Sequence, residues 1–156
     1  GMRFLDLFAG CGTMGIEALS RGADFVAFVE KHPESLKLLQ MNLKKVEERI
    51  SEQVRLQQID ILKADVALIG KNQAKLGLFD IVWADPPYHD ADVWAKTFPQ
   101  IIPPFVGQVG CFCVETDVKY VKLYTETMNA ESDLKLDKER RYGQTSLLFF
   151  SQKQPG

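Results

Sequence analysis

The sequence lacks the features that mark secreted, metal-binding and membrane-spanning chains. Among 156 residues there are only three cysteines, Cys11, Cys111 and Cys113, and no C-x-x-C spacing. An odd count without metal-type spacing argues against a disulfide framework or a zinc site, so no metal is predicted and the chain is expected to be reduced and cytoplasmic. No apolar run is long enough to cross a bilayer, and we therefore expect no membrane partner.

An excess of one charge is also missing. The net charge is −2, with 19 Lys and Arg against 21 Asp and Glu. Any contact with a nucleic acid must then come from a local basic patch, because the molecule as a whole is not a polycation. What is present is an ordinary globular composition, 46% hydrophobic, in a length that predicts one domain over residues 1–156.

Hydrophobic runs alternate with glycine and proline breaks along the chain. This pattern predicts strands at 3–8, 25–30, 54–59, 78–84 and 109–115, and helices at 16–21, 33–50, 62–76 and 91–102. The last segment, 134–151, is typical of two strands around Gly143-Gln144, which is a hairpin signal. The predicted fold is α/β: a doubly wound, mostly parallel, Rossmann-like sheet closed by a C-terminal antiparallel hairpin.

Polar and glycine signals recur at the predicted strand ends. Gly10 and Gly12 follow the first strand, Glu30 ends the second, Asp60 ends the third and Asp85 follows the fourth. Ligands of such sheets bind outside the carboxyl ends of the strands. The sequence therefore predicts that these residues share one ligand-binding edge.

The glycine loop predicts a cofactor containing adenosine. Gly10, Gly12 and Gly15 match G-x-G-x-x-G between a strand and a helix, and Glu30 stands where an acid binds a ribose. The motif alone fits NAD or S-adenosylmethionine. Asp6 within the first strand favours the methyl donor, whose ammonium group an acid can meet, although Asp6 could also brace the loop backbone. Glu30 could likewise be a solvated carboxylate at a strand end.

Asp60 and Ile61 have two interpretations. Asp60 could accept a hydrogen bond from an adenine amino group while Ile61 packs on the ring. Asp60 is equally suited to cap the N-terminus of the predicted helix 62–76.

The segment Asp85-Pro86-Pro87-Tyr88 predicts chemistry on a planar amine. Each proline fixes its own φ and pushes the residue before it into extended geometry. Asp85 then offers a carboxylate and Pro86 a carbonyl to the N–H groups of an exocyclic amine or side-chain amide, and Tyr88 offers a face on which a base can stack. The alternative, a rigid proline turn, explains neither the acid nor the tyrosine.

Four segments together resemble the RsmD-like family. They are LDLFAGCGTMGIEALSRGA (Leu5–Ala23), FVEK (Phe28–Lys31), DIVWADPPY (Asp80–Tyr88) and RRYGQTSLLFF (Arg140–Phe150). These proteins are bacterial S-adenosylmethionine-dependent methyltransferases that modify the exocyclic N2 of a guanine in 16S ribosomal RNA. The resemblance covers essentially the whole chain, and the full set in this order is more specific than the glycine loop or D-P-P-Y alone.

The resemblance implies a class I methyltransferase fold and a role for each matching residue. The cofactor site would be lined by Asp6, Phe8, Ala9, Gly10, Gly12, Glu30, Lys31 and Asp60. Asp85, Pro86 and Pro87 would orient the amine, with Tyr88 stacked on the base, and Arg140, Arg141 and Tyr142 would lie near the RNA. The expected partner is 16S rRNA or the small ribosomal subunit, bound by a monomer. Since Asp137 and Glu139 interleave with the basic residues, a solvated hairpin remains equally compatible.

One further expectation follows from the resemblance. Family members normally carry an N-terminal β-hairpin and helix that help to close the cofactor pocket, so a chain starting at Met2 is expected to bind the cofactor more weakly. Other functions stay open: amino methylation of DNA adenine or protein glutamine, an NAD-dependent oxidoreductase that would leave Asp85–Tyr88 unexplained, or an inactive module that binds RNA or S-adenosylmethionine.

Overall fold

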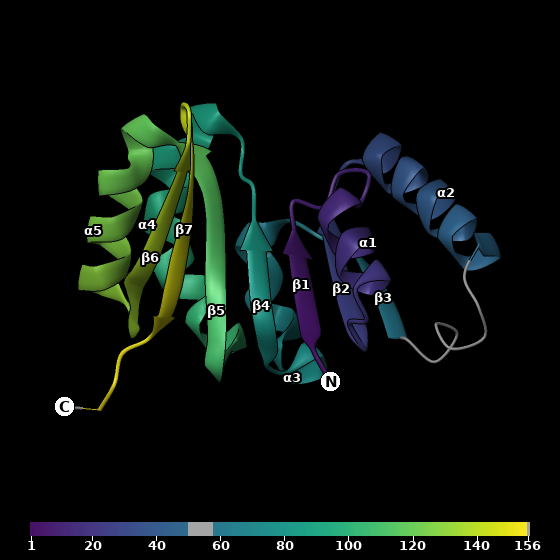
Figure 1. Cartoon of the computed structure of the whole chain (residues 1–156), viewed down its shortest axis with the longest axis horizontal. Coiled ribbons are helices and arrows are strands. Elements are labelled where there is room, and N and C mark those ends of the chain that lie inside the picture. Colours follow the sequence, from purple (N-terminus) through teal and green to yellow (C-terminus); the bar gives the residue numbers. More distant parts are fainter. Residues whose placement is uncertain (50–57, 156) are drawn as a thin grey trace. The chain divides into compact units, whose positions relative to one another are not determined.

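The computed structural model describes residues 1–49 and 58–155 (Figure 1). The chain divides into two compact units, Gly1–Ile69 and Gly70–Gly156, which are described in turn. Most of the strand predicted at 54–59 lies outside the described residues. The prediction of one domain stays a prediction.

The described residues of the first unit form three parallel strands and two α-helices. They are β1 (Arg3–Leu7), α1 (Thr13–Ser20), β2 (Phe25–Glu30), α2 (Pro33–Arg49) and β3 (Gln58–Lys63). β2 is central and pairs in parallel with β1 on one side and β3 on the other. Its residues Val26 to Val29 are fully buried, as expected for a parallel strand that is apolar on both faces.

The long helix α2 is amphipathic, as predicted. Leu36, Leu39 and Leu43 are buried at helical spacing, whereas Leu38 and Met41 are exposed. α1 ends as predicted too, because Gly22 adopts a left-handed φ of +96° and its N–H bonds the carbonyl of Leu19.

The third strand differs from its prediction. β3 runs from Gln58 to Lys63, so Asp60 lies inside the strand, level with Ala27 of β2, and does not end it. The pairing with β2 continues as far as Glu30 and Lys63, which extends the strand into the region predicted to be helical. A 3₁₀ helix (Val66–Asn72) and the short α3 (Gln73–Leu76) follow in place of one helix.

The second unit holds four strands in the order β4-β5-β7-β6, with two long helices. Its elements are β4 (Phe79–Ala84), α4 (Ala91–Ile101), β5 (Val106–Asp117), α5 (Val121–Glu131), β6 (Leu134–Tyr142) and β7 (Thr145–Gln152). β4 and β5 are parallel, and β7 is antiparallel to both β5 and β6. The hairpin predicted around Gly143-Gln144 is confirmed as the turn between β6 and β7 (Figure 1), with Gly143 at a left-handed φ of +60°.

An aromatic cluster forms the core between the helices and strands of this unit. Phe98 of α4 meets the edge of Phe112 at 5.2 Å and stacks on Tyr124 of α5 at 6.1 Å. Phe112 lies 6.1 Å from Phe150 of β7. Alternate residues of β5 and β7 therefore face α4 and α5, which cover one face of these strands.

The pairing of β4 with β5 contains a register shift. Phe79 is level with Val106, but Ile81 is level with Cys111, so β5 carries three extra residues there. Position 110 requires glycine, because a Cβ there would stand only 2.7 Å from the carbonyl oxygen of Phe79. The neighbouring Val109 is 94% exposed. Beyond the shift the pairing is regular and brings Ala84 level with Val114.

The predicted fold class is confirmed: the strands are mostly parallel, helices flank them, and the C-terminal pair is antiparallel. Within the described residues, the helices are all too short or too polar to span a bilayer.

Candidate active site

The glycine loop after β1 is a tight turn with left-handed backbone. Phe8, Gly10 and Gly12 have φ values of +55°, +57° and +90°. The N–H of Ala9 bonds the carbonyl of Val29, and the N–H of Gly12 bonds the carbonyl of Ala9, both within 2.9 Å. The left-handed conformation costs a residue with a Cβ roughly 1–2 kcal/mol, so Phe8 is held there by its surroundings.

Glu30 fixes this loop to the end of β2. Its side chain is buried, with the residue 7% exposed, and Oε1 accepts a 2.8 Å hydrogen bond from the N–H of Gly10. Oε2 accepts from the N–H groups of Lys31 and His32, each at 2.9 Å. The solvated-carboxylate alternative is therefore wrong. A carboxylate has about four acceptor positions, so about one remains for a ligand hydroxyl group.

Asp6 of β1 stabilises the same loop by a hydrogen bond. The residue is 2% exposed, and Oδ2 accepts a 3.0 Å hydrogen bond from the N–H of Gly15 in the first turn of α1. A Cβ on Gly15 would stand 2.2 Å from the ring of Phe28, so only glycine lets α1 approach β2 this closely. The bracing interpretation is confirmed, and contact with a cofactor ammonium group stays a prediction.

Gly10 and Gly12 serve different purposes. A Cβ on Gly12 would stand 2.3 Å from the side chain of Leu39, so this glycine is required by packing against α2. A Cβ on Gly10 would meet nothing within 4 Å. The backbone at Gly10 therefore borders open space that a ligand can enter.

Asp60 and Ile61 do not have the predicted position at the end of the third strand. Both lie inside β3, so Asp60 cannot cap the following helix. Asp65 takes that role, since its Oδ1 accepts a 3.0 Å hydrogen bond from the N–H of Ala67. Asp65 and the buried Val66 repeat the pattern of an acceptor followed by an apolar side chain, and the N–H of Ala64 bonds the carbonyl of Glu30 at 3.2 Å. Sequence reasoning missed this pair because it ended the strand too early.

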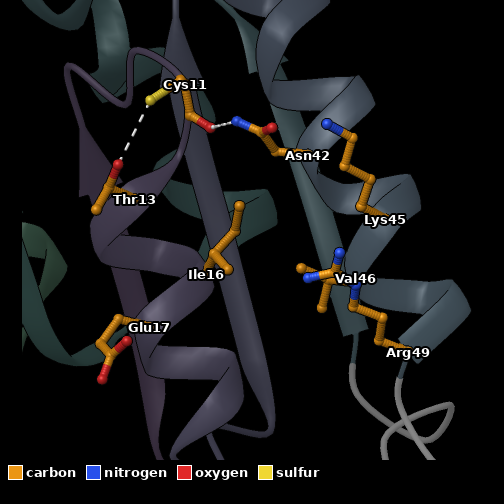
Figure 2. A pocket seen from close by; sticks show the side chains of 8 residues that line it. All are labelled: Cys11, Thr13, Ile16, Glu17, Asn42, Lys45, Val46 and Arg49. Carbon is orange, nitrogen blue, oxygen red and sulfur yellow. Dashed lines mark hydrogen bonds between the residues drawn. The ribbon is translucent and has the colours of Figure 1, made fainter.

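A cavity of about 350 Å³ opens between α1 and α2 (Figure 2). It is lined by Cys11, Thr13, Ile16, Glu17, Asn42, Lys45, Val46 and Arg49. Asn42 donates a 2.9 Å hydrogen bond to the carbonyl of Cys11, which ties α2 to the glycine loop. The residues that line this cavity include none of the predicted cofactor residues, although Cys11 and Thr13 belong to the glycine loop.

In the second unit, Asp85-Pro86-Pro87-Tyr88 connects β4 to α4. Pro86 is buried, whereas Asp85 and Pro87 are exposed and Tyr88 is 51% exposed. Pro87 is extended, with φ −55° and ψ 132°, and its carbonyl accepts a 3.1 Å hydrogen bond from the N–H of Asp90. The segment thus leaves both Asp85 and Tyr88 exposed, and their roles toward an amine and a base stay a prediction.

The Asp85 carboxyl group has an unusual environment. Although the residue is exposed, the pKa of Asp85 is raised to about 7 by burial of its carboxyl group first, and then by the charge of Glu115 and a hydrogen bond with the Glu115 side chain. Glu115 lies on β5, directly after the residue that is level with Ala84. Sequence reasoning did not select Glu115, although the strand VGCFCVE ends on it.

The residues predicted to face RNA are divided between two faces of β6. Arg140 is level with Leu147 and Tyr142 with Thr145, so they share a face. Lys138, level with Phe149, lies on the same face.

Arg141 lies on the opposite face of the strand. It is level with Ser146, which is buried and donates a 2.9 Å hydrogen bond to Glu139. The Arg141 Nε atom donates to the carbonyl of Gly143 at 3.2 Å, within the turn of the hairpin.

Comparison with known proteins identifies the family. A family model described as Conserved hypothetical protein 95 matches residues 1–151. The chain belongs to this family, the RsmD family. The resemblance stated from the sequence is confirmed.

Two relatives are named for methylation of ribosomal RNA. The Bacillus subtilis (strain 168) protein YlbH, named as an rRNA methyltransferase candidate, is 28% identical over 155 residues, which is 98% of this chain and 77% of YlbH. Ribosomal RNA small subunit methyltransferase D of Buchnera aphidicola is 37% identical over 87 residues, 56% of this chain and 41% of the relative. The match therefore spans less than half of this second relative.

Solved structures agree with the fold. A conserved hypothetical protein of Streptococcus pyogenes is 30% identical, with a TM-score of 0.71 over 98% of this chain and 87% of its own. TrmN from Thermus thermophilus has a TM-score of 0.77 over 97% of this chain and 44% of its own. At 19% identity the second match shows the fold alone.

Proposed function

We propose that the chain transfers a methyl group from S-adenosylmethionine to the exocyclic N2 amine of a guanine in 16S rRNA. The observation that carries this proposal is Asp85-Pro86-Pro87-Tyr88 at the end of β4 in a chain of the RsmD family. The names of two relatives, which refer to ribosomal RNA, support the substrate class. The choice of guanine N2 rests on the family resemblance.

The first unit suits S-adenosylmethionine. The open space at Gly10 lets a ligand approach the loop backbone, and Glu30 keeps about one acceptor position for a ribose hydroxyl group. Lys31 is exposed beside it, and Asp65 and Val66 replace Asp60 and Ile61 as the pair proposed for the adenine. When bound, the cofactor supplies a methyl group on a positively charged sulfur, with a neutral thioether as the leaving group.

The second unit supplies groups for the amine. The Asp85 carboxylate accepts a hydrogen bond from one N–H of the guanine amine, and this localises the nitrogen lone pair for attack. The half-exposed ring of Tyr88 stacks on the base, which contributes about 1–3 kcal/mol. Catalysis then rests mainly on positioning and electrostatics.

The proposal is tested by incubating the protein with S-adenosylmethionine carrying a labelled methyl group and with either 16S rRNA or small ribosomal subunits. Digestion to nucleosides and mass spectrometry should show labelled N2-methylguanosine. Label in a glutamine of a ribosomal protein, or in adenine when DNA is offered as a separate substrate, would replace the proposed substrate. Binding of NAD without binding of S-adenosylmethionine would overturn the cofactor as well.

Two variants sharpen the test. Asp85→Asn keeps the shape but loses the negative charge, and we expect methyl transfer to fall by at least about tenfold while cofactor affinity is unchanged. His89→Gln is the matched control, because His89 is exposed and pairs only weakly with Asp90 at 3.5 Å. Equal activity of all three proteins would exclude the role of Asp85.

A further inference from the structure

Asp85 and Glu115 are brought together by the pairing of two parallel strands. Ala84 at the end of β4 is level with Val114 of β5, and each carboxylate residue comes directly after its member of this pair. This register places the two residues next to each other on neighbouring strands, although 30 positions separate them in the sequence. The charge of Glu115 and a hydrogen bond with its side chain both contribute to the raised pKa of Asp85. Within β5, Glu115 is held on its other side by pairing with Leu147 of β7.

The groups around this carboxyl pair add little positive charge. Cys113 neighbours Glu115 on β5, and burial, Cys111 and Glu115 raise the pKa of the Cys113 thiol to about 12. Burial raises the pKa of Tyr124 on α5 as well, with contributions from Tyr120, Asp85 and Asp92. Other ionisable groups close in the sequence or the sheet include His89 and Asp90, which follow Asp85 along the chain, and Arg140 of β6, level with Leu147.

We propose that Glu115 is a positioning residue, which holds the Asp85 carboxyl group by a hydrogen bond and controls when Asp85 can accept a proton from the substrate amine. This proposal rests on the proposed function. Two carboxyl groups in contact cannot both ionise freely, so Asp85 keeps its proton to a higher pH than an ordinary carboxyl group and, while protonated, donates it to Glu115. In that state the bond fixes the direction of the Asp85 side chain.

Methyl transfer leaves one proton on the amine nitrogen that must be released. The amine nitrogen of guanine forms a bond to the methyl carbon with its lone pair, the bond from that carbon to sulfur breaks, and its electrons stay on sulfur. The nitrogen is then positively charged and releases one proton to the ionised Asp85. Because the pKa of Asp85 is about 7, the proton can pass on to water at neutral pH, which resets the carboxylate.

The inference is tested first without substrate. Carbon-13 NMR of the side-chain carboxyl groups, assigned with Asp85→Asn, should show Asp85 titrating near pH 7. In Glu115→Gln, which keeps the size and can still donate a hydrogen bond, the Asp85 pKa should fall by about one unit or more. Glu115→Asp keeps the negative charge, so in this variant the pKa of Asp85 should again be raised.

Asp117→Asn is the matched control. It removes one negative charge two residues further along β5, and its remaining carbonyl can still accept the 2.9 Å hydrogen bond from the N–H of Lys119. We expect the Asp85 pKa to stay near that of the parent protein. An equal fall in Asp117→Asn, or no fall in Glu115→Gln, would overturn the proposal.

The second measurement is the pH dependence of methyl transfer to RNA. In the parent protein kcat/KM should rise as the pH passes through about 7, because Asp85 becomes ionised there. In Glu115→Gln this rise should move to lower pH by the same amount as the NMR titration, with Asp117→Asn unchanged. A rise that stays at the same pH in Glu115→Gln would contradict the inference. If no guanine is methylated at all, the proposed function fails, whereas the NMR titration still reports on the carboxyl pair.

Discussion

Glu30 shows how one side chain can organise a loop. Both of its oxygens accept hydrogen bonds from backbone N–H groups, one from Gly10 and two from Lys31 and His32. A glutamine of the same size would have to turn its NH₂ group toward one of these donors. The carboxylate is therefore required for the geometry of the loop, whatever ligand it also binds.

Glu30→Gln should lower the free energy of unfolding by about 1–3 kcal/mol, because buried donors lose their acceptor. It should also weaken S-adenosylmethionine binding. Urea denaturation and calorimetric titration measure the two effects. Glu17→Gln is the control: its 2.8 Å pair with Arg21 is exposed, so it should change stability by less than ~1 kcal/mol. Similar losses in both variants would contradict the role given to Glu30.

Substitution by alanine should destabilise the protein for different reasons at Gly15 and at Gly10. Gly15→Ala places a Cβ 2.2 Å from the buried Phe28 ring, and we expect it to cost about 1–3 kcal/mol of stability. Gly10→Ala meets no atom within 4 Å but has a φ of +57°, so its stability cost should be roughly 1–2 kcal/mol.

The two variants separate packing from binding. Gly10→Ala should lose more cofactor affinity than Gly15→Ala, because its methyl group projects into the space proposed for the ligand. Calorimetry at a temperature where both variants are folded makes this comparison. The reverse order of affinities would mean that the ligand does not approach the loop at Gly10.

Among the elements, the β6–β7 hairpin decides by its register which of the residues proposed to contact RNA share a face. Lys138, Arg140 and Tyr142 form one row on β6, and Tyr142 is 60% exposed. Arg141 lies on the other face, with its guanidinium group engaged by the turn. The two adjacent arginines are therefore not equivalent.

Arg140→Ala should weaken binding to 16S rRNA more than Arg141→Ala does. It should also lower the slope of log Kd against the logarithm of the salt concentration by about one, as expected for the loss of one phosphate contact. Lys122→Ala, on the exposed face of α5, serves as the control for loss of charge. Filter binding over a range of salt concentrations provides the measurement. A larger effect of Arg141→Ala would place the RNA on the opposite face of β6.

Most elements could be predicted from the sequence because their signals are local. Strongly apolar runs such as 25–30 and the Gly143-Gln144 turn carry their own signal. α5 was missed because VKLYTETMNAE has only Tyr124 and Met128 as buried anchors, and its helix depends on packing against α4 and β6. The end of β3 was misplaced because pairing with β2 decides it, and that pairing is not visible in the local sequence.

In the candidate site, too, residues with a local sequence signal could be predicted, and those placed by strand pairing could not. The glycine loop, Glu30 and Asp85 could be predicted because each belongs to a contiguous motif. Glu115 could not, because it becomes a neighbour of Asp85 only through the register of β4 and β5.

For the whole molecule, cofactor binding should appear as added stability. S-adenosylmethionine at about 100 times its Kd should stabilise the folded protein by about 2.7 kcal/mol, which corresponds to roughly 5–10 °C in Tm. Differential scanning fluorimetry with and without the cofactor measures this shift. NAD at the same concentration should leave Tm unchanged, and a shift with NAD alone would favour the oxidoreductase alternative.

The three extra residues in β5 have a consequence for how such a site could change during evolution. If the spacing between Phe79 and Val106 continued unbroken, residue 85 would stand level with Phe112, an aromatic core residue. The insertion around Gly107–Gly110 advances β5 by three positions, so Glu115 arrives there in its place. A local change in strand length near the opposite end of β4, around the 94% exposed Val109, thus decides which chemical group accompanies Asp85. Lengthening or shortening that bulge would exchange the companion of Asp85 without altering a residue of the motif itself.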